Sequence, residues 1–184
     1  MPKSSTSEFE RLKSIMQQLR NPDGGCPWDL EQTFETIAPY TIEEAYEVAD
    51  AIERKDCGDL KDELGDLLLQ VVFHSQIAQD SGLFDVEDVA RSINDKMVRR
   101  HPHVFGDAKE RDADTQTEAW ETIKARERAA KGAVTEDTSA LAGVAKALPA
   151  LMRAEKIQKR AARTGFDWTE PRDILMKLDE ECDE

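Results

Sequence analysis

Four carboxylates occur in two pairs at helical spacing, Glu44 with Glu47 and Glu63 with Asp66. Residues three apart lie on one face of an α-helix, so each pair would present both acids on the same side. Four carboxylates that converge cannot all stay ionised unless a cation lies among them. Mg²⁺ suits such a group, because it binds a few carboxylates, keeps several waters and leaves positions for substrate phosphates. The spacing therefore predicts a cation site that receives a phosphorylated substrate.

The sequence around Glu63 and Asp66 favours a cation site over a solvated acidic face. Acid-rich chains contain such pairs by chance, and this alternative stays open for Glu44 and Glu47. Glu63 and Asp66, however, lead directly into residues 67–73, which are apolar nearly all round and typical of a buried helix. Carboxylates at the start of a buried helix cost desolvation free energy unless they are compensated. Gly65 also lowers helix propensity, which fits the close approach of a ligand or another backbone.

Other catalytic arrangements lack their defining residues. The chain has no Gly-x-x-x-x-Gly-Lys phosphate loop, no Gly-x-Gly-x-x-Gly and no His-Glu-x-x-His. A di-iron bundle needs Glu-x-x-His pairs, and no histidine of this chain has Glu three residues before it. Neither a serine nor a cysteine has a recognisable nucleophile setting, and His74 is predicted to be a packed core histidine.

The elements that would position the carboxylates are helices. Helical periodicity dominates and alternation of apolar and polar residues is nearly absent, which predicts an all-α fold. Thr41, with Glu44 three residues later, is the expected N-cap of one helix, and Asp59 is the expected N-cap of the next. The short turn between them, at 55–58, predicts an antiparallel hairpin in which the two acidic pairs face each other. The expected helices span about 8–19, 41–54, 59–79, 86–100, 115–131 and 145–163.

Charge is unevenly distributed along the 184 residues. The chain has 25 Lys and Arg against 39 Asp and Glu, a net charge of −14 and a pI of about 4.7. This excess argues against a nucleic-acid-binding surface over the whole chain, but not against nucleotides that a cation brings to the protein. Residues 41–88 hold fourteen acids and three bases, whereas residues 89–106 carry a net charge of +3. An acidic hairpin is thus followed at once by a basic helix.

Targeting signals are not evident in the sequence. No stretch approaches the length of a membrane span, and the first seven residues lack the apolar core of a secretory signal. The three cysteines form neither an even disulfide framework nor a Cys-x-x-Cys pair. We therefore expect a cytoplasmic protein with reduced thiols, bound to no membrane.

Four motifs, taken together in order and spacing, resemble the MazG family. They are Asn-Pro-Asp-Gly-Gly-Cys-Pro-Trp-Asp at 21–29, Glu-Glu-x-x-Glu at 43–47, Glu-x-x-Asp at 63–66 and Arg-Arg-His-Pro-His-Val-Phe at 99–105. MazG proteins are nucleoside triphosphate pyrophosphohydrolases of the all-α NTP pyrophosphatase superfamily. The resemblance implies a helical bundle completed by homodimerisation. It also implies Mg²⁺-dependent hydrolysis of NTPs or dNTPs to the monophosphate and pyrophosphate, of housecleaning type, with Mn²⁺ as a substitute cation.

The resemblance also assigns roles to residues that match the family motifs. Glu44, Glu47, Glu63 and Asp66 would be the metal ligands. Glu43 would support a ligand or act as base for the attacking water. The basic stretch would face the triphosphate through Asn94, Lys96, Arg99 and Arg100, while Trp120 and Lys124 would lie near the nucleotide. Cations also favour a helix C-terminus, and a lone tryptophan on an amphipathic helix is often a core residue, so these alternatives stay open.

The C-terminal part repeats the order of features at the start. A basic helix is followed by Gly165-Phe166-Asp167-Trp168 and then by Glu-Glu-x-x-Glu at 180–184. We interpret residues 1–131 as a MazG-like domain, 132–144 as a linker and 145–184 as the start of an incomplete second repeat. The hypothesis is that the chain is a truncated form of a longer protein, although an acidic tail can spell the second motif by chance. Two functional alternatives remain: a catalytically silent dimerisation or regulatory module, and a metal-binding structural hairpin without a nucleotide substrate.

Overall fold

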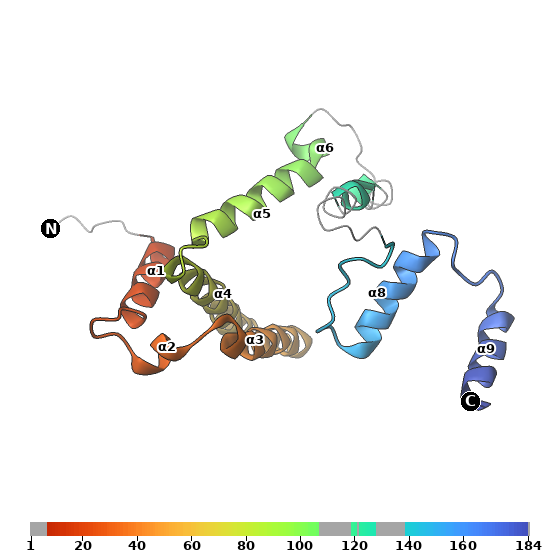
Figure 1. The fold of residues 1–184 in the computed structure, drawn as a ribbon, viewed down its shortest axis with the longest axis horizontal. Coiled ribbons are helices and arrows are strands. Elements are labelled where there is room, and N and C mark those ends of the chain that lie inside the picture. Colours follow the sequence, from red (N-terminus) through yellow and green to blue (C-terminus); the bar gives the residue numbers. More distant parts are fainter. Residues whose placement is uncertain (1–6, 107–118, 121, 128–138, 184) are drawn as a thin grey trace. The chain divides into compact units, whose positions relative to one another are not determined.

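The computed structural model describes residues 7–106, 119–120, 122–127 and 139–183. All regular elements within these ranges are helices, which confirms the predicted all-α class (Figure 1). The chain forms two compact units, Met1–His101 and Pro102–Glu184. Within the described ranges, no helix is both long enough and apolar enough to cross a membrane.

The first unit is built around a helix hairpin. Its helices are α1 (Glu8–Leu19), α2 (Pro27–Glu31), α3 (Phe34–Arg54), α4 (Cys57–Asp80) and α5 (Val86–Arg100). The periodicity predicts α1 and α5 at these bounds. It predicts no helix at residues 27–31, where the structure has α2. Pro27 begins α2, where its fixed φ is favourable and its missing N–H costs nothing.

Helix α3 begins well before the predicted N-cap. Thr33 caps it, and Thr33 and Thr36 exchange the two hydrogen bonds of a capping box. The prediction that Thr41 caps this helix is wrong, because the local bonds at Thr33 start the helix and Pro39 is accommodated inside it. The Thr41 hydroxyl donates instead to the carbonyl of Ile37 at 3.4 Å, one turn earlier.

The connection between α3 and α4 is shorter than predicted. Asp56, not Asp59, caps α4, since Asp56 Oδ1 accepts hydrogen bonds from the backbone N–H groups of Gly58 and Asp59, both at 3.0 Å. Lys55 ends α3 in the left-handed region, at φ 58°. The side chain of Asp59 is then available to pair with Arg54.

Helix α4 carries most of the core of the first unit. Met16 from α1 and Ile37 from α3 pack with Val72, Phe73 and Ile77 of α4, each at most 5% exposed. Burial of each such side chain stabilises the fold by about 1.5–3 kcal/mol. The packed second half of α4 therefore holds the acidic first half of the helix in place.

A charged contact ties α1 and α2 to the end of α4. The guanidinium of Arg20 lies 5.7 Å from the Phe73 ring and donates to Asp80 at 2.7 Å and to the backbone carbonyl of Asp29 at 2.5 Å. Trp28 of α2 packs edge-on against Phe73, with ring centroids 6.4 Å apart. These contacts hold the loop before α3, and so the start of the hairpin.

The second unit contains α6 (Pro102–Phe105), helical residues at 119–120 and 122–127, α8 (Ala150–Ala162) and α9 (Pro171–Asp183). The predicted helix at 115–131 is helical where it is described, and its other residues lie outside the described ranges. The helix predicted from residue 145 begins only at Ala150, because Pro149 disfavours the helical conformation of the residue before it. Helix α9 was not expected, although Pro171 at its first position and apolar Ile174 and Leu178 four apart are helix signals.

Candidate metal and nucleotide site

The two acidic helices meet in a defined register. The Oγ1 of Thr41 on α3 and the Nε2 of His74 on α4 lie 3.0 Å apart in a hydrogen bond. His74 also stacks on Phe34, with ring centroids 6.0 Å apart and 15° between the planes. His74 is half-buried rather than a fully packed core residue, and its contacts fix how α3 and α4 align.

Three of the predicted carboxylates converge across this hairpin. Glu44 from α3 and Glu63 and Asp66 from α4 each offer an oxygen, and these oxygens all lie within 4.8 Å of one another. Glu44 and Glu63 are half-buried, whereas Asp66 is exposed. The structure thus brings together acids from both sequence motifs, as the helical spacing and the tight turn predict.

The electrostatics of the cluster favour a bound cation. Burial raises the pKa of Glu44, and the charges of Asp66, Glu47 and Glu63, together with a hydrogen bond to Glu47, raise it further. Burial also raises the pKa of Glu63, with added repulsion from Glu47, Asp59 and Asp66. Both shifts mean that ionised carboxylates are destabilised here, and a cation would relieve that destabilisation.

Glu47 and Glu43 lie outside the set of three. Glu47 is exposed but close enough to raise the pKa of both Glu44 and Glu63. Glu43 is exposed one position away from Glu44 on α3. Neither side chain contributes an oxygen to the convergent group in the conformation observed.

A cation of the protein itself lies beside the cluster, and sequence reasoning missed it. Arg54 pairs with Asp50 at 2.7 Å and with Asp59, and its positive charge acts to lower the pKa of Glu63. The signal was present in the sequence, because Asp50 and Arg54 are four apart on one helix face. Arg54 balances part of the acidic charge at the turn end of the hairpin.

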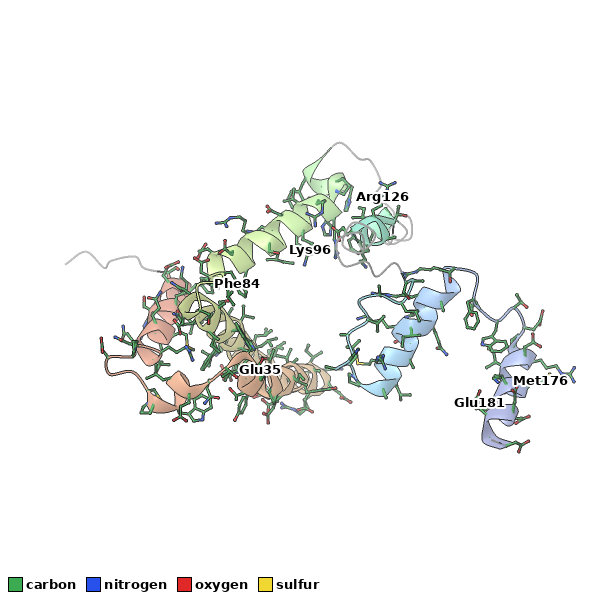
Figure 2. All side chains as sticks on the ribbon, in the orientation of Figure 1. Glu35, Phe84, Lys96, Arg126, Met176 and Glu181 are labelled. Carbon is green, nitrogen blue, oxygen red and sulfur yellow. The ribbon has the colours of Figure 1, made fainter. Side chains whose placement is uncertain are left out.

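The predicted phosphate-binding residues lie on α5 in the same unit. Lys96 and Arg100, four residues apart, are half-buried, whereas Asn94 and Arg99 are exposed. Lys96 and Phe84, both labelled in Figure 2, line a shallow pocket of about 430 Å³ with Asp88, Val89, Ser92 and Ile93. The pocket combines an aromatic wall, a hydroxyl and an ammonium group.

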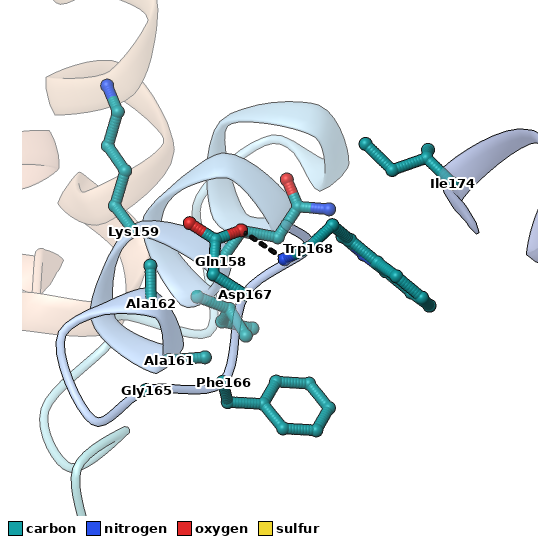
Figure 3. A pocket seen from close by; sticks show the side chains of 10 residues that line it. Gln158, Lys159, Ala161, Ala162, Gly165, Phe166, Asp167, Trp168 and Ile174 are labelled. Atoms are coloured by element: carbon teal, nitrogen blue, oxygen red, sulfur yellow. Dashed lines mark hydrogen bonds between the residues drawn. The ribbon is translucent and has the colours of Figure 1, made fainter. Parts of the chain in front are cut away.

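The remaining predicted residues lie in the second unit. Trp120 and Lys124 are half-buried and four residues apart on the helical segment there. The same unit has a cavity of about 660 Å³ between α8 and the start of α9, which no prediction anticipated (Figure 3). Phe166, Trp168 and Ile174 form part of its lining, and Asp167 Oδ1 accepts a hydrogen bond from the backbone N–H of Trp168 at 2.8 Å.

Comparisons with known proteins relate the carboxylate hairpin to a described domain family. A family model described as "MazG nucleotide pyrophosphohydrolase domain" matches residues 32–105, which include all three convergent carboxylates. Similar curated proteins include the "Nucleoside triphosphate pyrophosphohydrolase" of Escherichia coli K12, 54% identical over 97% of this chain. The "Nucleoside triphosphate pyrophosphohydrolase/pyrophosphatase MazG" of Thermotoga maritima is 47% identical over 96% of this chain.

The extent of these matches differs between the chains. This chain spans 66% of the length of the Escherichia coli protein and 65% of the Thermotoga maritima protein. A crystal structure of a MazG-related protein from Thermotoga maritima matches 62% of this chain and 97% of its own, with a TM-score of 0.53 and 28% identity. The domain match and the identity to these relatives show that this chain belongs to the MazG family.

Proposed function

We propose that this protein hydrolyses nucleoside triphosphates, NTPs or dNTPs, to the nucleoside monophosphate and pyrophosphate. The observation that carries the proposal is the convergence of Glu44, Glu63 and Asp66 within 4.8 Å, inside the segment that matches the MazG domain. Such a reaction needs anionic ligands for a cation and a positively charged surface for the phosphates. The acidic hairpin would supply the anionic ligands, and α5 of the same unit would supply the positive charge.

The donor set fits Mg²⁺, with Mn²⁺ as a substitute. Three carboxylate oxygens are hard ligands, and they leave further positions for water and phosphate oxygens. Glu44, Glu63 and Asp66 would hold the ion, and Glu47 would join them by a change of side-chain rotamer. When bound, Mg²⁺ would neutralise phosphate charge and lower the pKa of a bound water.

The other residues take their proposed roles from the family motifs. Glu43 would receive the proton of the attacking water or support a ligand. The triphosphate would be bound by Lys96 and Arg100, with Asn94 and Arg99 alongside, and the charge on the departing pyrophosphate would be stabilised there. Trp120 and Lys124 would contact the nucleotide.

We further propose a homodimer in the cytoplasm. Exposed apolar residues form a stripe on α4, with Leu64, Leu68 and Val71 between 39% and 49% exposed, and Ile42 and Tyr46 form another on α3. A partner's hairpin would cover these stripes and complete the helical bundle. All three cysteines are free, which suits a reducing compartment.

The division at 132–144 and the second repeat are also proposals. Helices α8 and α9 flank Trp168 much as α1 and α3 flank Trp28, and α9 carries Glu180 and Glu181. If 132–144 is a linker, limited proteolysis should cut there first and leave residues 1–131 folded. Early cleavage inside α3 or α4 would contradict the division.

The proposed activity is tested by following pyrophosphate release from each NTP and dNTP in the presence of Mg²⁺. Glu63→Gln keeps the size of the side chain but removes a charged ligand. It should lower kcat/KM by about a hundredfold or more, since removing even a group that only orients a ligand costs about 10- to 100-fold.

Glu31→Gln is the matched control, because Glu31 is exposed at the end of α2, outside the acidic hairpin and its apolar stripes. Its activity should equal that of the native chain. Equal activity of Glu63→Gln and the native chain would refute the site, and no release from any nucleotide would favour a silent module.

A further inference from the structure

Gln70 on α4 is a buried polar residue that the carboxylate motifs do not include. It is only 8% exposed, and its side-chain oxygen Oε1 is buried without a hydrogen-bond partner. Buried polar atoms in folded proteins are nearly always hydrogen-bonded to protein or to ordered water. An acceptor in this state indicates a donor that only a ligand or a water supplies.

The position of Gln70 places it at the carboxylate cluster. It follows Asp66 by four residues and Glu63 by seven, so all three lie on one face of α4. One turn further on, His74 contacts Thr41, and Glu44 follows Thr41 by three residues on α3. In an antiparallel hairpin with this register, Gln70 is level with the turn of α3 that runs from Thr41 to Glu44.

The three convergent carboxylates offer Gln70 no donor when they are ionised. Glu44, Glu63 and Asp66 then only accept hydrogen bonds. The Thr41 hydroxyl donates to the carbonyl of Ile37 and shares a second hydrogen bond with His74. A water molecule would supply the donor that Oε1 lacks, and a hydrated cation at the carboxylates would bring one.

We propose that Gln70 is a positioning residue, whose Oε1 accepts a hydrogen bond from a water of the cation bound at Glu44, Glu63 and Asp66. The inference rests on the proposed function of the site. Gln70 fixes the orientation of one water before the nucleotide arrives. Groups that orient metal ligands in this way commonly affect metal affinity as strongly as 10- to 100-fold.

The test uses the full chain and Gln70→Met, which keeps the length of the side chain and removes the acceptor. The metal-free melting temperature should stay equal or rise, because an unpaired buried polar atom has been removed. The Kd for Mn²⁺, measured by calorimetry or electron paramagnetic resonance, should weaken about tenfold. Gln70→Glu restores an oxygen acceptor and should restore Mn²⁺ affinity. Steady-state kinetics should show a lower kcat with little change in KM.

Gln79→Met is the control, since Gln79 is an exposed residue of the same helix. Unchanged Mn²⁺ affinity in Gln70→Met would overturn the proposal, and so would a parallel loss of metal-free stability, which marks a purely structural role. If the native chain binds Mn²⁺ and hydrolyses nucleotides, and Gln70→Met binds Mn²⁺ equally well, this inference alone is refuted. If the native chain binds Mn²⁺ but hydrolyses no nucleotide, and Gln70→Met binds Mn²⁺ more weakly, the role of Gln70 is supported and the proposed activity is refuted.

Discussion

Glu44 combines two opposing requirements in one side chain. It faces α4 in the hairpin interface, where burial and three neighbouring acids destabilise its ionised form. Metal binding needs the ionised form. The metal-free protein therefore carries a stability cost at this residue, and a cation at about a hundred times its Kd would stabilise the fold by about 2.7 kcal/mol.

His74 makes the stability of the fold depend on pH, because its pKa is lowered whereas that of Glu44 is raised. Burial lowers its pKa below the ordinary value of 6.5, so the unfolded chain binds a proton more readily than the folded one. By linkage, the contribution of His74 to stability is lost as the pH falls through 6.5 towards the folded-state pKa. His74→Gln should cost about 1 kcal/mol at pH 8, where the stack on Phe34 is lost, and less at pH 5.

Denaturant unfolding of both proteins at several pH values measures this difference. A gap between native and His74→Gln that stays constant from pH 8 to pH 5 would contradict the linkage. Thr41→Val is a useful companion, because it removes the hydrogen bond to His74 while leaving the stack on Phe34 in place.

Residue spacing predicted the convergent acids but not their immediate surroundings. Glu44, Glu63 and Asp66 could be placed because helical spacing and a short turn are local properties. Gln70 could not, since its importance depends on the register between α3 and α4. The spacing of Asp50 and Arg54 signals an ion pair, but it does not show that Arg54 lies near Glu63. That register follows from contacts such as Thr41 with His74, which link residues far apart in sequence.

At the scale of elements, the turn between α3 and α4 limits the geometry of the site. Lys55 adopts the left-handed conformation, at φ 58°, which is strained for any residue with a Cβ. Asp56 caps the next helix immediately afterwards. The two helices are thus held close together at the end near Glu63.

Lys55→Gly should stabilise the protein. Relief of left-handed strain at a helix C-terminus outweighs the added freedom of the unfolded chain, and we expect a gain of about 0.5–1 kcal/mol. Thermal and denaturant unfolding measure it. Gly82→Ala is the converse change, since Gly82 has φ 68° and open space around a Cβ, and it should destabilise by a similar amount. A loss of stability in Lys55→Gly would show that the lysine side chain matters more than its backbone.

Helix starts were predicted less well than helices. Thr41 and Asp59 have the residue types of N-caps, but Thr33 and Asp56 make the capping hydrogen bonds. Several candidate caps stand close together in both segments, and residue type alone does not rank them. The capping hydrogen bonds of Thr33 and Asp56 set these starts, and they agree with the packing, in which Ile37 enters the core.

At the scale of the whole molecule, the exposed stripes on the hairpin predict self-association. Leu68→Glu places a charge in the stripe on α4 and should shift the protein from dimer to monomer in light scattering after gel filtration. Ile52→Glu is the control for the effect of added charge alone, because Ile52 is also exposed on α3 but lies outside both stripes. It should leave the dimer unchanged. A native chain that is monomeric at high micromolar concentration would refute the dimer.

The two-residue turn between α3 and α4 also has a consequence for folding kinetics. Contacts between Glu44, Glu63 and Asp66 are close in sequence, so the hairpin closes a short loop and is suited to form early. Mutual repulsion of the acids would then oppose an early folding step, not only the finished structure. Added Mg²⁺ would speed refolding if the site is already formed in the transition state, and would slow unfolding if it forms later.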